Sequence, residues 1–312
     1  MWGVMTILSG GSAAGDVPGP EPEPARFELI VLGIAQDGGV PHVGCEKDCC
    51  REARASGRTL FPASLGIHDR ATGARVLVEA TPAVEPQLAL FHARTGERGQ
   101  GRAPVDAVLL THAHIGHYLG LAHFGREVAS TDRLPVYAST RLAAFLRGNG
   151  PWSQLVDLDQ IAIREVDPEA PFEPVPGVRV TAVPVPHRDE FSDTMAFRIE
   201  AGTSRILFVP DVDAWDREPG LLERLLDGVT AAFVDATFYD GSELPGRDLG
   251  TIPHPLMTDT MDRLAAWGRD HPGVLAFIHL NHTNPALRDP AIRERIESRG
   301  FRIAEQGERL PL

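Results

Sequence analysis

Three histidines lie within one short segment of the chain. Residues 111–117 read THAHIGH and directly follow the largely apolar stretch VDAVLL. In extended backbone, side chains two positions apart point the same way, so His112 and His114 can hold one ion between them, and His117 lies across the following turn. Imidazole nitrogen is a preferred ligand of zinc and other first-row metals. The spacing therefore predicts a metal site.

Further polar side chains stand where other apolar runs stop. His187 follows VTAVPVP, Asp211 follows ILFVP, and His279 follows LAFI. Loops at strand ends bring distant parts of a chain together, because the sheet fixes where each strand finishes. We therefore expect these three side chains to join the histidines of residues 111–117 in one or two sites of four or five ligands.

The rest of the chain has the pattern of a mixed α/β protein. Strands are expected at residues 27–32, 75–79, 107–110, 178–185, 195–200, 205–209, 231–234 and 274–279. Helices are expected at residues 119–128, 140–147, 220–226, 256–267 and 290–298. No boundary is visible after the first residues, so we expect one domain over residues 25–312, preceded by a disordered tail over residues 1–24.

Composition limits the partners and the chemistry. The 312 residues are 43% hydrophobic and 23% charged, which suits a globular body. The formal net charge of −13 disfavours nucleic acid and anionic membranes, and no apolar run is long enough for a membrane-spanning helix. Lys47 is the sole lysine, so a phosphate-loop lysine is excluded and catalysis falls to His, Asp, Cys or Arg. We expect a small-molecule or peptide substrate, and the oligomeric state is open.

The segment THAHIGH resembles the HxHxDH signature of the metallo-β-lactamase superfamily, which implies an αββα four-layer sandwich. The resemblance assigns His112, His114 and His187 to a first metal, His117 and His279 to a second, and Asp211 as the bridging carboxylate. Gly116 stands where the family has aspartate, which removes one ligand of the second metal. Asp213 and Asp189 are candidates to replace it.

Three further blocks, LGIAQDGGVPH, FVDATFYDGSEL and FIHLNHTNPAL, resemble the pyrroloquinoline quinone (PQQ) synthesis protein B family, and the likeness covers most of the chain from Phe27 onward. Asp235, Tyr239, Asp240 and His254 match positions in that family and are candidates to line a pocket. We expect no ligand role for the remaining histidines, which are His42, His68, His92, His123 and His271.

The three cysteines lie within six residues, which makes a poor disulfide framework and favours the cytoplasm, with a periplasmic or secreted location as the alternative. The stretch GCEKDCCREA resembles the GCxCxxCRxA segment of a related cyclic-phosphodiesterase branch, which holds a structural zinc. Cys45 and Cys50 match that segment, and Lys47 replaces its middle cysteine. The resemblance implies a Cys3His zinc site in which Cys49 takes the middle position and His282 is the fourth ligand.

The leading functional hypothesis is a metal-dependent hydrolase of an ester or phosphodiester-like small substrate. One or two zinc ions would lower the pKa of bound water so that a metal-bound hydroxide attacks, with Asp211 orienting it. His254 or Asp235 would donate a proton to the leaving group.

Two alternatives stay open. His112, His114 and Asp211 could instead form an open iron(II) site of an oxygenase acting on a tyrosine-bearing peptide, as the PQQ family implies, and manganese is a further candidate metal. The loss of the motif's aspartate at Gly116 leaves a third reading, a zinc-stabilised binding protein without catalysis.

Overall fold

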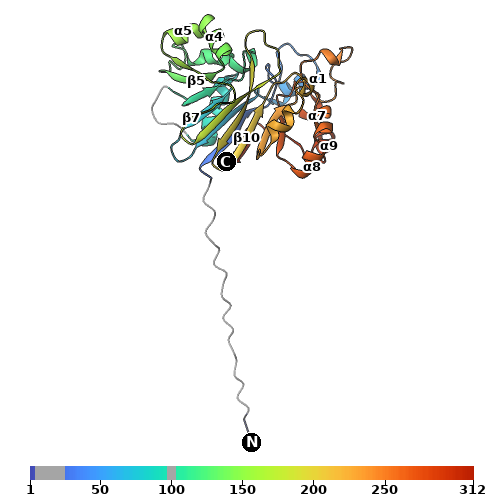
Figure 1. Ribbon diagram of the computed structural model, residues 1–312. Coiled ribbons are helices and arrows are strands. Elements are labelled where there is room, and N and C mark those ends of the chain that lie inside the picture. The colour runs from blue at the N-terminus through green and yellow to red at the C-terminus, as the bar shows by residue number, and fades with distance from the viewer. Residues whose placement is uncertain (4–24, 97–102) are drawn as a thin grey trace.

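Two β-sheets face each other and carry helices on their outer sides, which gives the layer order helix, sheet, sheet, helix (Figure 1). The computed structural model describes residues 1–3, 25–96 and 103–312. The predicted αββα sandwich is confirmed. Apart from its first three residues, the predicted tail over residues 1–24 lies outside the described part of the chain.

Each sheet has seven strands among the described residues, in the order β14-β1-β2-β3-β4-β5-β6 for the first and β13-β12-β11-β10-β9-β8-β7 for the second. The first sheet contains β1 (Phe27–Gly33), β2 (Ser64–Asp69), β3 (Arg75–Val78), β4 (Ala107–Leu109), β5 (Leu134–Ala138), β6 (Ile161–Glu165) and β14 (Arg309–Pro311). The second contains β7 (Pro171–Val175), β8 (Val178–Val185), β9 (Thr194–Ala201), β10 (Ser204–Val209), β11 (Ala231–Asp235), β12 (Leu275–Ile278) and β13 (Arg302–Ile303).

The helices flank the two sheets on opposite sides, with α4 and α5 beyond the first sheet and α7, α8 and α9 beyond the second (Figure 1). The α-helices are α1 (Asp48–Ser56), α2 (Val84–Thr95), α3 (Ile115–Tyr118), α4 (Thr140–Gly148), α5 (Trp152–Asp157), α6 (Leu221–Leu226), α7 (Met257–Arg263), α8 (Ala265–Asp270) and α9 (Pro290–Glu297). The short 3-10 helices are η1 (Leu119–Phe124), η2 (Trp215–Arg217), η3 (Leu249–Thr251) and η4 (Pro285–Leu287).

Alternate side chains of β1 enter two different cores, because neighbouring residues of a strand point to opposite faces. Leu29 and Val31 lie between the sheets together with Phe233 of β11. Ile30 lies in the outer core, where Phe91 of α2 covers the first sheet. A strand that is covered on both faces is mostly apolar, and the run Leu29–Leu32 explains why β1 could be recognised from its sequence.

Strand direction decides where the chemistry collects. In the first sheet β1, β3 and β4 run the same way, and in the second sheet β8, β10, β11 and β12 do so. Their carboxyl ends therefore lie at one edge of each sheet. The two edges are joined by hydrogen bonds, such as the one that the Met195 amide donates to the Thr111 carbonyl at 3.1 Å. The loops that follow these strands meet at this joint edge.

Some elements differ from the expected ones. β2 was not expected, because Gly66 interrupts its apolar pattern, and the structure shows the ring of Phe91 packed where a side chain at position 66 would stand. The helix expected over residues 119–128 is a 3-10 helix that ends at Phe124, just before Gly125. The helix expected over residues 256–267 is divided at Leu264 into α7 and α8.

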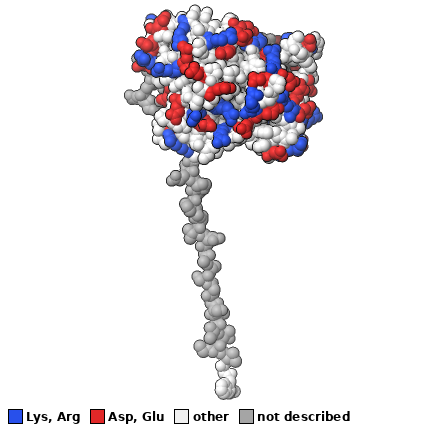
Figure 2. Space-filling view, viewed as in Figure 1, with Lys and Arg blue, Asp and Glu red and all other residues white. Residues whose placement is uncertain are grey.

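The surface is mixed in charge. On the face shown in Figure 2, acidic and basic side chains of the described residues are interspersed rather than segregated. Within the described ranges, none of the helices combines the length and the apolar character that a membrane crossing requires.

A buried glutamate fastens the edge of the first sheet. Glu28 of β1 accepts hydrogen bonds from Arg70 at 2.9 Å and from Arg309 of β14 at 2.6 Å, and its other oxygen lies 2.9 Å from Nδ1 of His68. Burial alone would raise the pKa of Glu28, but the contacts with Arg70, His68 and Arg309 lower it to about 2. The ionised carboxylate thus ties β14 to the sheet.

We predict that Glu28→Gln lowers the free energy of unfolding at pH 7. A folded-state pKa below the ordinary value of 4.5 stabilises the protein above that value, and the stabilisation is lost as the pH falls towards 2. The difference between wild type and variant in urea unfolding should therefore shrink as the pH falls below about 5. Glu294→Gln, at an exposed glutamate of α9, is the control and should show no such trend. A difference that stays constant from pH 7 to pH 4 would contradict the prediction.

Candidate metal centre

The first group of possible ligands lies at the ends of β4, β8 and β10. Nε2 of His112 is 2.9 Å from Nδ1 of His114, and Nε2 of His187 is 3.1 Å from the same nitrogen. Oδ2 of Asp211 is 3.3 Å from Nε2 of His112. Each residue offers one ligand atom, and these atoms all lie within 4.8 Å of one another. The structure thus brings together the four side chains that the sequence assigned to a first metal position.

A second group shares Asp211 with the first. Nε2 of His117 lies 2.9 Å from Oδ2 of Asp211 and 3.4 Å from Oδ1 of Asp37. Nε2 of His279 lies 3.5 Å from the same Asp37 oxygen. These four residues form a second set with ligand atoms within 4.8 Å of one another. His117 and His279 therefore lie where the sequence placed them, and Asp37 joins them unexpectedly.

Several buried polar atoms in these groups have no hydrogen-bond partner among the described residues. They are Oδ1 of Asp37, Nε2 of His117, Oδ1 of Asp211 and Nε2 of His279. Buried polar atoms are rarely left without a partner, and a concentration of them points to an ion or another bound group. The donor set of imidazoles and carboxylates is suited to first-row divalent metals, so these residues fit the metal that the family motif implies.

Each histidine of the two groups has an outer contact to the ring nitrogen that faces away from the shared centre. Such contacts fix the orientation of a metal-binding imidazole. The pairs are His112 Nδ1 with Thr111 Oγ1 at 2.9 Å, His114 Nε2 with Glu190 at 3.1 Å, His117 Nδ1 with Glu79 at 3.5 Å, His187 Nδ1 with Asp213 at 2.9 Å, and His279 Nδ1 with Thr237 Oγ1 at 3.0 Å. Four of the rings are thus oriented by an outer hydrogen-bond partner, whereas Nδ1 of His117 and the facing Glu79 oxygen form no hydrogen bond.

The two carboxylates of the centre are held in their ionised form. Burial alone would raise the pKa of Asp211, but positive charge at His279 and contacts from His112 and His117 hold it well below its usual range. Burial likewise opposes ionisation of Asp37, and contacts with His117 and His279 still lower its pKa below the usual range. Both side chains are therefore ready to serve as anionic ligands.

A third group adjoins the centre at the end of β11. Nδ1 of His254 lies 2.8 Å from Asp235 and 3.4 Å from Asp211. Burial alone would lower the pKa of His254, but the negative charge of Asp235 and the contact with it raise the pKa to about 9. Both oxygens of Asp235 are already in use, because one accepts from the Val212 amide and the other from Thr237. Asp235 thus holds the ring of His254, whose Nε2 is the nitrogen left to meet another molecule.

A cavity of about 650 Å³ opens beside His254. Its wall includes Trp215, Ile252 and Arg263. The segment 215–217, which forms η2, therefore contributes to this pocket. Residues 152–157 form helix α5, where Trp152 is buried against Tyr118. That helix packs against the outer core of the first sheet and lines no part of this cavity.

Other candidate residues lie elsewhere. Asp213 contacts His187 instead of standing in for the missing ligand, and Asp189 pairs with Arg141 at the surface. Asp240 accepts a hydrogen bond from the Ser242 amide within a turn. Tyr239 is buried and, like Asp240, does not line the cavity beside His254. The histidines expected to have no ligand role, which are His42, His68, His92, His123 and His271, lie outside all the groups of possible ligands found in the described residues.

Asp37 was not expected among the ligands, although it follows the apolar run of β1 just as Asp211 and His279 follow β10 and β12. It stands four residues beyond the end of β1 at Gly33, whereas Asp211 and His279 stand one or two residues beyond their strands. An acidic residue at that distance is ordinary in a loop, so only the folded structure reveals its place.

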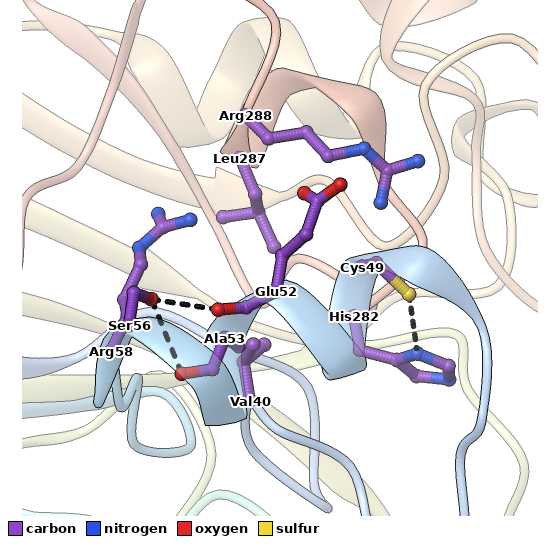
Figure 3. A pocket seen from close by; sticks show the side chains of 9 residues that line it. All are labelled: Val40, Cys49, Glu52, Ala53, Ser56, Arg58, His282, Leu287 and Arg288. Atoms are coloured by element: carbon purple, nitrogen blue, oxygen red, sulfur yellow. Dashed lines mark hydrogen bonds between the residues drawn. The ribbon is translucent and has the colours of Figure 1, made fainter.

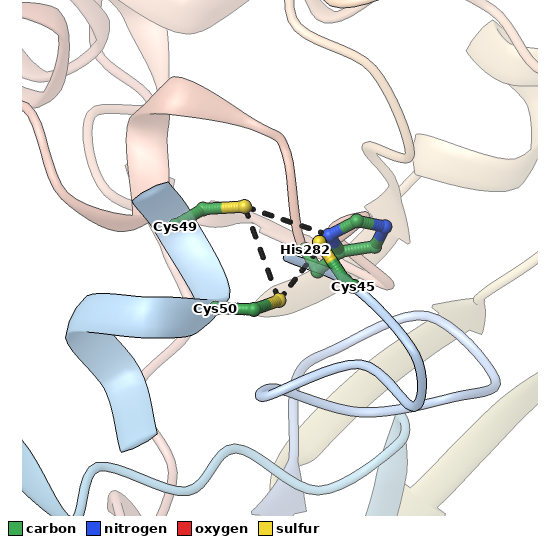
Figure 4. A group of neighbouring side chains, drawn as sticks. All are labelled: Cys45, Cys49, Cys50 and His282. Carbon is green, nitrogen blue, oxygen red and sulfur yellow. Dashed lines mark hydrogen bonds between the residues drawn. The ribbon is translucent and has the colours of Figure 1, made fainter. Parts of the chain in front are cut away.

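The three cysteines and His282 form a separate cluster at the start of α1 (Figure 4). Nδ1 of His282 lies 3.5 Å from Sγ of Cys50 and 3.6 Å from Sγ of Cys49, and the two sulfurs are 3.9 Å apart. Tetrahedral zinc with bonds of about 2.3 Å to sulfur and 2.0 Å to nitrogen separates its ligand atoms by roughly 3.5 to 3.8 Å. The cluster, which also includes Cys45, has the dimensions of a closed metal site.

The surroundings of this cluster favour a neutral imidazole and covered sulfurs. Burial and the nearby charge of His42 lower the pKa of His282 to about 4. The ring of His42 lies over that of His282 with 4.5 Å between centroids, and the His42 amide donates to Sγ of Cys50 at 3.2 Å. A small cavity of about 150 Å³ lies beside Cys49 and His282, between α1 and the segment that carries Arg288 (Figure 3).

Comparison with known proteins agrees with the fold. The family model described as the β-lactamase superfamily domain matches residues 74–309. The chain therefore belongs to the metallo-β-lactamase superfamily. Within it, the chain is similar over nearly its whole length to a coenzyme PQQ synthesis protein B from Methylobacterium sp. (strain 4-46), with 30% identity over 309 residues that cover 92% of this chain and 100% of the relative.

Solved structures share the same architecture. Zinc-bound PqqB from Methylobacterium extorquens has a TM-score of 0.77 at 24% sequence identity, with 91% of this chain and 100% of that chain covered. A diphosphatase from the PhnP family has a TM-score of 0.66 at 21% identity, with 91% of this chain and 96% of that chain covered. The predicted superfamily and the predicted resemblance to the PQQ synthesis family are both confirmed.

We predict that Cys50→Ala removes about one bound metal ion per chain and lowers the midpoint of thermal unfolding by several degrees, because a closed structural site stabilises the fold that forms it. Elemental analysis of purified protein and a thermal melt provide the two measurements. Ser56→Ala is the matched control, since Ser56 belongs to the same helix and its hydroxyl donates to the backbone carbonyls of Glu52 and Ala53 rather than to the cluster. An unchanged metal content in the Cys50 variant would show that the cluster holds no ion.

Proposed function

We propose that this protein is a metal-dependent hydrolase of a small ester or phosphodiester-like substrate. The observation that carries the proposal is the convergence of two groups of buried imidazoles and carboxylates on the shared carboxylate of Asp211, beside a cavity that His254 lines. Ligand groups of this kind commonly hold zinc, which we propose for the centre, with one or two ions per chain. When bound, such ions provide Lewis-acid charge and lower the pKa of water towards neutrality.

The residues of the chain have distinct proposed roles. Asp211 contributes to both positions and, at 3.4 Å from Nδ1 of His254, also faces the third group. Its carboxylate is placed to orient an attacking water. His254 is the proposed proton donor to the leaving group, since its Nδ1 is engaged by Asp235 while the ring borders the cavity. We propose Asp235 as the positioning residue for that ring rather than as a proton donor, because it is fully buried.

The substrate class follows from the size and lining of the cavity. About 650 Å³ is within the range of small-molecule pockets. Trp215, Ile252 and Leu256 offer apolar contact, and Arg263 with the acidic Asp216 and Asp259 adds charge. A diphosphatase shares the fold at a TM-score of 0.66, which makes phosphate esters the first class to assay.

The cysteine cluster is proposed to hold a structural zinc through Cys45, Cys49, Cys50 and His282. All positions of a tetrahedral site are then supplied by the protein, so this ion stabilises the fold and takes no part in turnover.

A second candidate function is oxidative. The full-length similarity to a PQQ synthesis protein favours it, as does the ability of two histidines and a carboxylate to bind iron(II). Iron in the purified protein, with turnover that requires oxygen, would support this function over hydrolysis. A third candidate is a zinc-stabilised binding protein, and the carboxylate of Asp37 beside Gly116 favours the hydrolase over it.

We predict that Asp211→Asn lowers hydrolysis of phosphodiester and ester test substrates by about 100-fold or more, since the change removes the charge shared by both ligand groups. Steady-state kinetics and metal content are measured together, and a thermal melt checks the fold. Asp189→Asn is the control, because that carboxylate pairs with Arg141 at the surface. Full activity of the Asp211 variant would remove this residue from the mechanism.

We predict that His254→Gln slows the hydrolysis of substrates with a poor leaving group far more than that of substrates with a good one. A proton donor matters most where the departing oxygen is basic. The variant should therefore lose much more kcat on alkyl esters than on p-nitrophenyl esters of the same acid. The ratio of kcat values for the two substrates is the readout. An equal loss on both would assign His254 to positioning rather than to proton transfer.

A further inference from the structure

We propose that Asp37 replaces the carboxylate ligand that the family motif carries at position 116. On this reading the second metal position is completed by Asp37, His117, Asp211 and His279. The inference rests on the proposed metal centre and deepens it, because it gives the second position a full set of ligands drawn from this chain alone.

Asp37 occupies the space into which a side chain at position 116 would extend. A Cβ atom added to Gly116 would lie 1.9 Å from Oδ1 of Asp37, 2.6 Å from its Cγ and 2.8 Å from its Cα. Carbon and oxygen atoms in contact keep more than about 3 Å apart. No side chain therefore fits at position 116 while the loop that carries Asp37 has this conformation. The glycine that breaks the motif is therefore what admits the substitute carboxylate.

The loop holds Asp37 beside its partners. The Gln36 amide donates to the Leu280 carbonyl at 2.9 Å, and the Leu280 amide donates to the Ile34 carbonyl at 2.9 Å. The segment before Asp37 is thus paired with the residue that follows His279. Beyond Asp37, the Gly39 amide closes a turn onto the Gln36 carbonyl at 2.8 Å, and Gly39 has a φ of +65°, which favours glycine.

The spacing of the atoms suits coordination better than hydrogen bonding. Oδ1 of Asp37 is buried and lies 3.4 Å from Nε2 of His117 and 3.5 Å from Nε2 of His279, with no hydrogen bond to any described residue. Four ligands at about 2.0 to 2.2 Å from a tetrahedral ion are separated by roughly 3.3 to 3.6 Å. The side chains of His117 and His279 are about 1% exposed, so bulk water does not reach their ring nitrogens.

The test counts metal ions without relying on turnover. The full chain is treated with a chelator to remove weakly held ions and then titrated with Mn²⁺, while free Mn²⁺ is measured by electron paramagnetic resonance. Mn²⁺ prefers oxygen ligands to thiolates, so it reports on the active centre rather than on the cysteine cluster. We expect the wild type to bind two Mn²⁺ ions. Asp37→Ala should keep the first and raise the dissociation constant of the second at least about ten-fold.

Two further variants separate a lost ligand from a lost fold. Asp37→Asn preserves the size of the side chain and should also weaken the second ion, because the charge is gone. Gly116→Ala removes no ligand atom, yet its methyl group displaces Asp37 and should weaken the same ion. Asp189→Ala, at a surface carboxylate paired with Arg141, should bind both ions as the wild type does. Thermal melts establish that each variant is folded.

The proposal is overturned if folded Asp37→Ala and Asp37→Asn bind two Mn²⁺ ions with wild-type affinity, or if the wild type binds only one. It is also overturned in its steric part if Gly116→Ala leaves the second ion unchanged. These outcomes are independent of hydrolysis. A chain that hydrolyses nothing but loses its second Mn²⁺ on mutation of Asp37 would sustain this inference and defeat the proposed function.

Discussion

The buried carboxylate of Asp211 is the constraint on which the rest of the molecule depends. It is almost inaccessible to solvent and stays ionised among His112, His117 and His279. A charge in such a place is tolerated only when opposite charge and suitable partners surround it, because burial of an isolated ion is strongly unfavourable. The imidazoles supply part of that compensation, and divalent ions bound at the proposed metal centre would supply more. Binding of such ions would therefore also stabilise the folded chain.

The αββα sandwich brings the possible metal ligands together from remote parts of the chain. His112 follows a strand of the first sheet, whereas His187, Asp211 and His279 follow strands of the second. The hydrophobic core between the sheets fixes the separation of those strand ends, so the positions of the ligands follow from packing that lies far from them. Outer hydrogen bonds, such as the one between Asp213 and Nδ1 of His187, then set the rotation of the rings that make them.

Much of this could be read from the sequence, for reasons that differ between residues. β1 and β10 were found because each contains a run of four buried apolar residues, Leu29–Leu32 and Ile206–Val209, whereas β2 was missed because Gly66 accommodates Phe91 and breaks the pattern. The spacing of His112 and His114 is local, so two residues suffice to predict a shared ion. His187, Asp211 and His279 were found because each follows its strand closely. The predicted roles of all these residues in metal binding and catalysis stay predictions until ions and turnover are measured.

Asp37 could not be found in the same way, since its contribution depends on how a loop turns back over Gly116. The two residues are 79 positions apart in the sequence but in contact in the fold, and the spacing along the chain does not predict that contact. The interpretation of Asp213 failed for a related reason. One oxygen of Asp213 lies 2.9 Å from Nδ1 of His187 and the other 2.7 Å from Arg217, so its carboxylate is engaged outside the second ligand group. Competition among neighbours, which sequence alone does not rank, decides such cases.

The cysteine cluster lies on the same two segments that carry half of the second ligand group. Asp37 leads into the stretch that holds Cys45, Cys49 and Cys50, and His279 stands three residues before His282. An ion bound by the thiolates would clamp these segments to each other at a point outside the centre. Oxidation of a single sulfur would open that clamp, so we expect an oxidant to disturb the proposed metal centre through a cysteine that does not belong to it.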